Sequence, residues 1–105
     1  MKTLELLKDA NGRTILVIPL SDPQDVDGTS ASAVCANPID SNLCRILSLD
    51  NALRIAIGSS PVESPLEATA TGIALAAGAE IYQPCNEGDY VAVLGGKANI
   101  CTCGK

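Results

Sequence analysis

The sequence predicts an all-β fold, a small single-domain antiparallel β-sandwich or flattened barrel of about eight short strands that covers residues 1–105. Three observations support this prediction. Short apolar segments with period-two alternation recur from Leu43 to Thr102, and turn-forming residues separate them at near-regular intervals. Aromatic residues make up only 2% of the chain, with no Phe and no Trp. The core of such a domain must therefore be thin and aliphatic.

Residues 1–20 are expected to form an N-terminal hairpin or arm. Leu4 to Lys8 and Arg13 to Leu20 flank Ala10-Asn11-Gly12, and Asn-Gly between two apolar segments is a strong hairpin signal. A helix beginning at Leu4 is the opposing interpretation, because Leu, Glu and Lys favour helices, but a single helical turn is marginal in water.

Residues 21–32 are predicted to be a loop, because they contain Pro23, three Asp, Gly28 and a Thr-Ser-Ala-Ser run. This loop is the candidate for mobility or for contact with a partner. Residues 33–105 are expected to form the core of the sandwich. The first strand of that core is predicted at Ala33 to Ala36.

Two strands, residues 43–49 and 52–58, are predicted to form a hairpin around the turn Asp50-Asn51, since Asp and Asn tolerate positive φ. The second strand alternates in the manner of a half-buried strand. Its apolar face consists of Leu53, Ile55 and Ile57.

An extended excursion is predicted for residues 62–72. The competing interpretation is an Ala-rich helix over residues 65–77, whose first turn Pro65 would suit. Thr69, Thr71 and Gly72 disfavour that helix.

The end of the chain returns to strong strand signals. Strands are expected at residues 80–83, 90–94 and 98–102, and Gly95-Gly96-Lys97 is predicted to be a tight turn that makes the last two a hairpin.

Composition excludes several classes of function. The net charge is −5, and the seven Lys and Arg are scattered, so we expect no nucleic-acid partner. The longest apolar run, Ile15 to Leu20, contains a proline and is too short to cross a bilayer, so we expect no membrane partner. Histidine is absent, which removes the commonest general base and metal ligand. We therefore expect no catalytic residue, no cofactor, no metal and no small-molecule substrate.

Two weaker signals remain. Asp25-x-Asp27-Gly28 resembles the opening of a calcium loop but lacks its closing Glu, so a solvated acidic loop is preferred. The five cysteines are Cys35, Cys44, Cys85, Cys101 and Cys103. Reduced thiols that pack as small hydrophobic groups are the preferred interpretation. A three-thiolate zinc site and one or two disulfides remain as alternatives.

The second half of the chain resembles small β-sandwich virion proteins of tailed bacteriophages. The resemblance covers about Leu43 to Thr102. It rests on the segments Leu43-Cys-Arg-Ile-Leu-Ser48, Ala52-Leu-Arg-Ile-Ala-Ile-Gly-Ser-Ser-Pro61, Gly72-Ile-Ala-Leu-Ala-Ala-Gly-Ala-Glu80 and Asn86-Glu-Gly-Asp-Tyr-Val-Ala-Val93. The chain departs from the pattern by placing Cys85-Asn86-Glu87 before Gly88-Asp89 and by ending with Cys101-x-Cys103.

The resemblance implies a viral structural protein, not an enzyme. We expect it to decorate and cement a tailed-phage capsid by binding at junctions between major capsid subunits, as a homotrimer on the virion surface. A head-completion or fibre-base component with the same fold is an alternative within this class, and a metal- or disulfide-stabilised binding module is an alternative outside it. The candidate partner-contact residues are Ile15, Val17, Asp25, Asp27, Arg45 and Arg54.

Overall fold

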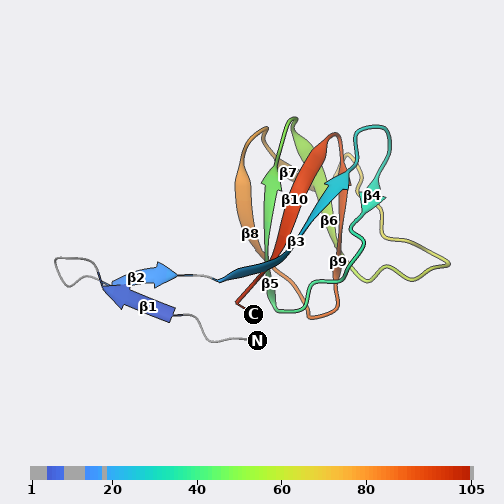
Figure 1. Ribbon diagram of the computed structural model, residues 1–105. Helices are drawn as coiled ribbons and strands as arrows, with labels where there is room; N and C mark the ends of the chain where they lie inside the picture. The colour runs from blue at the N-terminus through green and yellow to red at the C-terminus, as the bar shows by residue number, and fades with distance from the viewer. Residues whose placement is uncertain (1–4, 9–13, 18, 105) are drawn as a thin grey trace.

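Ten strands and no helix make up the part of the chain that the computed structural model describes, residues 5–8, 14–17 and 19–104 (Figure 1). No described segment is therefore a helix long and apolar enough to span a membrane. Eight strands form two four-stranded antiparallel sheets, and the first two form a separate two-stranded sheet. The predicted all-β sandwich is confirmed.

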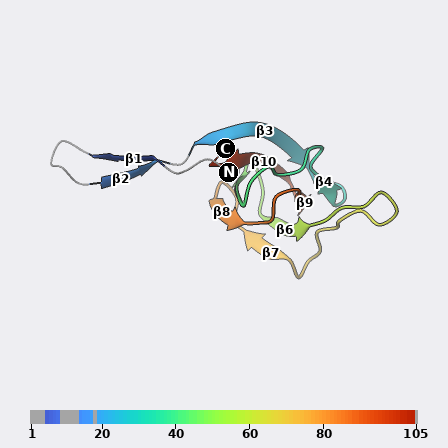
Figure 2. The same cartoon turned by 90° about the horizontal axis from the view of Figure 1, so that it is seen from below.

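The first sheet of the sandwich has the order β3-β10-β5-β8 and the second has the order β4-β9-β6-β7. The strands of the first are β3 (Leu20–Asp27), β10 (Lys97–Cys103), β5 (Leu43–Ser48) and β8 (Glu80–Pro84). The strands of the second are β4 (Ala33–Val34), β9 (Tyr90–Leu94), β6 (Leu53–Gly58) and β7 (Ile73–Leu75). Figure 2 shows the two sheets from one end, with β3 and β10 on one side and β6 and β7 on the other.

The core lies between the sheets and is aliphatic, as the composition predicts. Ile46 and Ile100 from the first sheet and Ile55 and Val93 from the second are all at most 1% exposed. Full burial of each such side chain contributes about 1.5–3 kcal/mol. The predicted alternation of residues 52–58 is confirmed, since Leu53 and Ile55 are buried and Ile57 packs against the core.

The predicted hairpin of residues 43–58 is wrong. β5 and β6 belong to different sheets, so the turn at Asp50 and Asn51 carries the chain from one sheet to the other. Neither turn residue has a positive φ, which a type I′ hairpin turn requires. The Ser48 hydroxyl donates to the Asn51 carbonyl oxygen at 2.6 Å and holds this crossing together.

The predicted hairpin at the end of the chain is also wrong. β9 pairs with β6 and β10 pairs with β5, so Gly95 and Gly96 form a second crossing between the sheets. Gly95 has φ = +111°, and a Cβ there would lie 2.8 Å from the Ala52 carbonyl oxygen. The residue must be glycine because both the conformation and the close approach exclude a side chain.

The predicted loop of residues 21–32 is replaced over most of its length by β3, an edge strand that pairs with β10. Asp22 and Pro23 stand opposite Cys101 alone, where the register shifts in a β-bulge. Asp22 has φ = +52°, and a bulge on an edge strand is one of the few places where a proline enters a sheet. Asp22 and Pro23, which are typical of a loop, therefore form a β-bulge within a strand.

Residues 59–72 form no helix, and the competing helix over residues 65–77 is wrong because β7 begins at Ile73. The predicted extended excursion is confirmed. β7 itself was not predicted, since three residues between turns give no periodic signal.

The predicted N-terminal hairpin is confirmed where the structure describes it. β1 (Glu5–Lys8) pairs with β2 (Thr14–Val17) in an antiparallel register, while the predicted Asn11-Gly12 turn lies outside the described residues. We call the pair β1 and β2 the arm. It points away from the sandwich in both Figure 1 and Figure 2.

Candidate binding surface

The six predicted contact residues do not form one surface. Ile15 and Val17 lie on β2 of the arm, where they stand opposite Leu7 and Glu5. The other four lie on the sandwich and are divided between its two sheets: Asp25 and Asp27 on β3, Arg45 on β5, and Arg54 on β6. The prediction that Arg45 and Arg54 lie on neighbouring strands is wrong, because β5 and β6 belong to different sheets.

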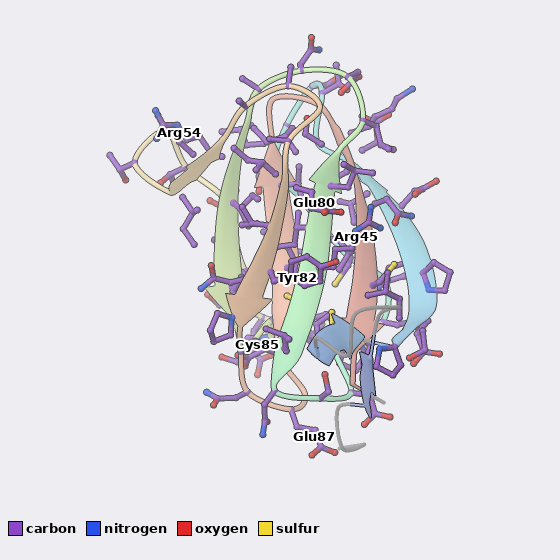
Figure 3. The ribbon with its side chains drawn as sticks, turned by 90° about the vertical axis from the view of Figure 1, so that its left-hand side faces the viewer. Arg45, Arg54, Glu80, Tyr82, Cys85 and Glu87 are labelled. Atoms are coloured by element: carbon purple, nitrogen blue, oxygen red, sulfur yellow. The ribbon has the colours of Figure 1, made fainter. Side chains whose placement is uncertain are left out.

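Arg45 lies on the outer face of the first sheet, where its Nε donates to Glu80 Oε2 at 2.5 Å. Glu80 belongs to β8 and stands one step diagonally from Arg45 on the same face. This hydrogen bond to the carboxylate raises the pKa of Arg45 above its usual value. Tyr82 pairs directly with Arg45 and is 43% exposed. Figure 3 shows Arg45, Glu80 and Tyr82 together, with Arg54 well apart from them.

The two predicted acidic residues of β3 both have partners within the chain. Asp25 Oδ1 accepts from Asn99 Nδ2 at 2.9 Å across the sheet. Asp27 Oδ1 accepts from the Thr29 hydroxyl at 2.6 Å and from the Thr29 backbone N–H at 3.0 Å. These hydrogen bonds lower the pKa of Asp27. Asp27 therefore closes a turn at the end of β3, as an Asx turn does.

Arg54 has a different local role. Its Nη1 donates to the Gly72 carbonyl oxygen at 3.1 Å, which ties the irregular segment before β7 to β6. A Cβ at Gly72 would lie 2.7 Å from the Ile55 carbonyl oxygen, so this segment passes close against the backbone of β6. The guanidinium of Arg54 thus stabilises the position of the segment before β7 through a hydrogen bond within the chain.

Four of the five cysteines, Cys35, Cys44, Cys101 and Cys103, are buried, and Cys85 is partly exposed; all five are free thiols. Burial raises the pKa of Cys35, Cys44 and Cys85, and raises that of Cys103 to about 11. Among the described residues no group of three or more Cys, Asp or Glu has an arrangement that could hold a metal ion. Raised pKa values keep thiols protonated and poorly nucleophilic at neutral pH.

Two hollows on the described surface bear on binding. The larger, about 800 Å³, lies beside the β-bulge and is lined by Asp22, Pro23, Pro38, Ile39, Asp40 and Glu87 among others. The smaller, about 400 Å³, lies between the edge strands β7 and β8 and is lined by Ile57, Ile73, Gln83, Pro84, Cys85 and Asp89 among others. We call the smaller one the edge groove. No sequence pattern predicts this groove, because its residues come from four separate segments and only the packing of the two sheets brings them together.

The edge groove contains one notable apolar residue. Ile73 is 41% exposed although it lies in a strand. Gln83 and Pro84 form the opposite wall, at the end of β8. β7 and β8 are each the last strand of a sheet among the described residues, so the groove lies beside two open sheet edges. A hollow with an apolar wall beside an open edge is an arrangement that can accept an added strand.

Comparison with known proteins identifies no relative: no protein-family model, no curated protein and no solved structure matches this chain.

Proposed function

We propose that this chain is a structural protein of a tailed-bacteriophage virion, which decorates and stabilises the capsid by binding where major capsid subunits meet, as a homotrimer. The sequence resemblance supplies the class of protein, and the all-β fold agrees with the fold that this class implies. The proposal excludes catalysis and assigns no cofactor.

One observation carries the proposal beyond the resemblance. Among the described strands, β1 and β2 pair with each other and with no third strand, while the eight remaining strands build the sandwich. The arm's central register pairs, Leu6 with Leu16 and Leu7 with Ile15, consist of apolar residues. Such an element is marginally stable by itself and calls for contact with another chain. We expect such an arm in a protein whose terminal hairpin becomes stable only when it contacts another subunit of an assembly.

Mass action explains how such a protein would stabilise a shell. A decoration protein that binds the assembled lattice, and not free subunits, lowers the free energy of the assembled state by an amount that grows with its free concentration. The outer face of the first sheet offers a suitable contact, with the exposed Tyr82 beside the Arg45–Glu80 ion pair. Tyrosine and arginine are enriched among the residues that dominate interface energetics.

The test is the copy number of the chain in purified virions of the phage that encodes it, measured by quantitative mass spectrometry. A decoration protein is present in numbers comparable to the major capsid protein, and virions that lack it lose their genome at a lower temperature. Absence from virions would exclude a structural role. A copy number that fits a single ring would instead favour a head-completion or fibre-base component.

A contact variant sharpens the test. Tyr82→Ala should weaken binding to shells that lack the protein by about tenfold or more, if Tyr82 lies at the centre of the contact. Val62→Ala is the matched control, since Val62 is 94% exposed in an irregular segment. Equal binding by both variants would place the contact elsewhere on the molecule.

A further inference from the structure

The arm forms a two-stranded sheet that is separate from the two sheets of the sandwich. Its two strands form a sheet of their own, and isolated two-stranded hairpins are at best marginally stable in water. The chain has a radius of gyration of 14.7 Å and a longest extent of 50 Å, whereas a compact chain of this length has a radius of about 13 Å. The arm therefore extends from the sandwich.

Charge is distributed unequally between the arm region and the sandwich. Residues 1–18 contain three basic and two acidic residues, a net charge of +1, and residues 19–104 contain three basic and ten acidic residues, a net charge of −7. The basic residues of the first region are Lys2, Lys8 and Arg13. Opposite net charges favour association of the arm of one copy with the sandwich of another.

The open edge of β8 has the features that an added strand requires. β8 lies at the end of its sheet in the described part of the chain, and the edge groove runs beside it. Ile57 and Ile73 form an apolar wall of the groove, and Ile73 is 41% exposed. Two acidic residues, Glu87 and Asp89, follow β8 in the next turn. The site thus combines strand pairing, an apolar wall and the negative charge of Asp89.

The arm cannot reach this edge within its own chain. β3, which the arm leads into, and β8 are the two outermost strands of a four-stranded sheet. An arm strand added outside β8 would lie four strand spacings, about 19 Å, from β3. Only Ile18 and Pro19 separate Val17 of β2 from Leu20 of β3, and three Cα–Cα steps span at most about 10 Å. The arm can therefore reach only another copy's β8.

We propose that the arm of one copy adds to the β8 edge of a second copy, with an apolar arm residue seated in the edge groove and Lys8, the last residue of β1, beside Asp89. This extends the four-stranded sheet across the interface by main-chain hydrogen bonds. This inference rests on the proposed function in one respect, namely that the arm contacts another subunit.

The experiment begins with native mass spectrometry and sedimentation velocity of the full chain from micromolar to submillimolar concentration. We expect a reversible oligomer. Ile15→Asp in the arm and Ile73→Lys in the groove should each weaken self-association by about tenfold or more, because each places a charge in an apolar contact. Val62→Lys is the matched control, since it adds the same charge at a position 94% exposed and distant in sequence. A wild-type chain that is monomeric throughout would overturn the proposal.

Mixing the two variants tests exchange between copies directly. The Ile73→Lys copy keeps a wild-type arm, and the Ile15→Asp copy keeps a wild-type groove. An equimolar mixture, with one variant labelled with ¹⁵N, should therefore form mixed oligomers at concentrations where the weakened association leaves each variant alone monomeric. Failure of the mixture to associate, or equal weakening by Val62→Lys, would overturn the proposal.

Amide hydrogen exchange of the wild-type chain gives a second measurement that needs no variant. The backbone N–H groups of Glu80 and Tyr82 alternate with those that bond to β5 and face the open edge. They should exchange more slowly as the protein concentration rises, because an added strand protects the edge. Unchanged exchange across the association range would exclude the β8 edge. Association in solution by a chain that is absent from virions would contradict the proposed function and leave this inference intact.

Discussion

Asp50 Oδ1 accepts a hydrogen bond from the backbone N–H of Lys97 at 2.9 Å. The same oxygen accepts from the Asn51 backbone N–H at 2.7 Å. Asp50 stands where the chain crosses between the sheets from β5 to β6, and Lys97 stands where it crosses from β9 to β10. One carboxylate therefore joins two crossings that lie far apart in the sequence, and it closes one end of the sandwich.

Asp50→Asn should lower the melting temperature at neutral pH. The two backbone hydrogen bonds lower the pKa of Asp50, so its stabilising contribution is present above the pKa of an unfolded Asp, about 3.9. The contribution is lost as the pH falls through the lower folded value. The difference between wild type and variant should therefore shrink below about pH 4. Calorimetry across pH measures it, with Glu63→Gln as the control; a difference that grows on acidification would contradict this role.

Gly28→Ala should destabilise the fold strongly. A Cβ at Gly28 would lie 2.1 Å from the Val93 carbonyl oxygen and 2.7 Å from its carbonyl carbon, and these are backbone atoms, which cannot turn aside as the end of a flexible side chain can. Gly28 also donates its N–H to the Gly96 carbonyl oxygen at 2.8 Å. Overpacking costs about 1–3 kcal/mol in general, and we expect this variant at the upper end or beyond it. Gly58→Ala, with its nearest atom at 3.9 Å, should change the free energy of unfolding much less in urea titrations.

Ile55→Ala should remove about 2–5 kcal/mol from the free energy of unfolding, since Ile55 is 1% exposed between the sheets. For a thin aliphatic core this is a large share of the total. Val62→Ala, at a position 94% exposed, should leave the denaturation midpoint unchanged within about 0.5 kcal/mol. Similar losses for both variants would contradict the assignment of the core.

Alkylation should modify Cys85 before the other thiols. Cys85 is the one partly exposed cysteine, whereas burial holds Cys35 and Cys44 protonated and out of reach. Iodoacetamide treatment of the folded, unreduced chain, followed by peptide mass spectrometry, gives the order. All five thiols should react once the chain is unfolded without reductant. Fewer than five would indicate a disulfide or bound metal and would revive the alternative of a cysteine-stabilised module.

The candidate contact residues show how far sequence reasoning reached. The alternation of residues 52–58 predicts that Arg54 points outward, and the structure places it there. The partner of Arg45 was not predictable, because Glu80 is 35 residues away in sequence and only the pairing of β5 with β8 brings them together. The edge groove was hidden for the same reason. Period-two patterns report which face a residue occupies, but they carry no information about which strands are neighbours.

Local sequence patterns predict the class of fold, the position of most strands and the aliphatic character of the core, because these depend on local alternation and on the free energy of burying aliphatic side chains. The tertiary structure alone decided how the strands pair. A two-residue turn such as Asp50-Asn51 serves a hairpin or a crossing between sheets equally well, and the choice depends on contacts such as the one from Asp50 to Lys97. The tertiary structure also places Pro23 in a strand, because the β-bulge opposite Cys101 forms only where β10 pairs with β3.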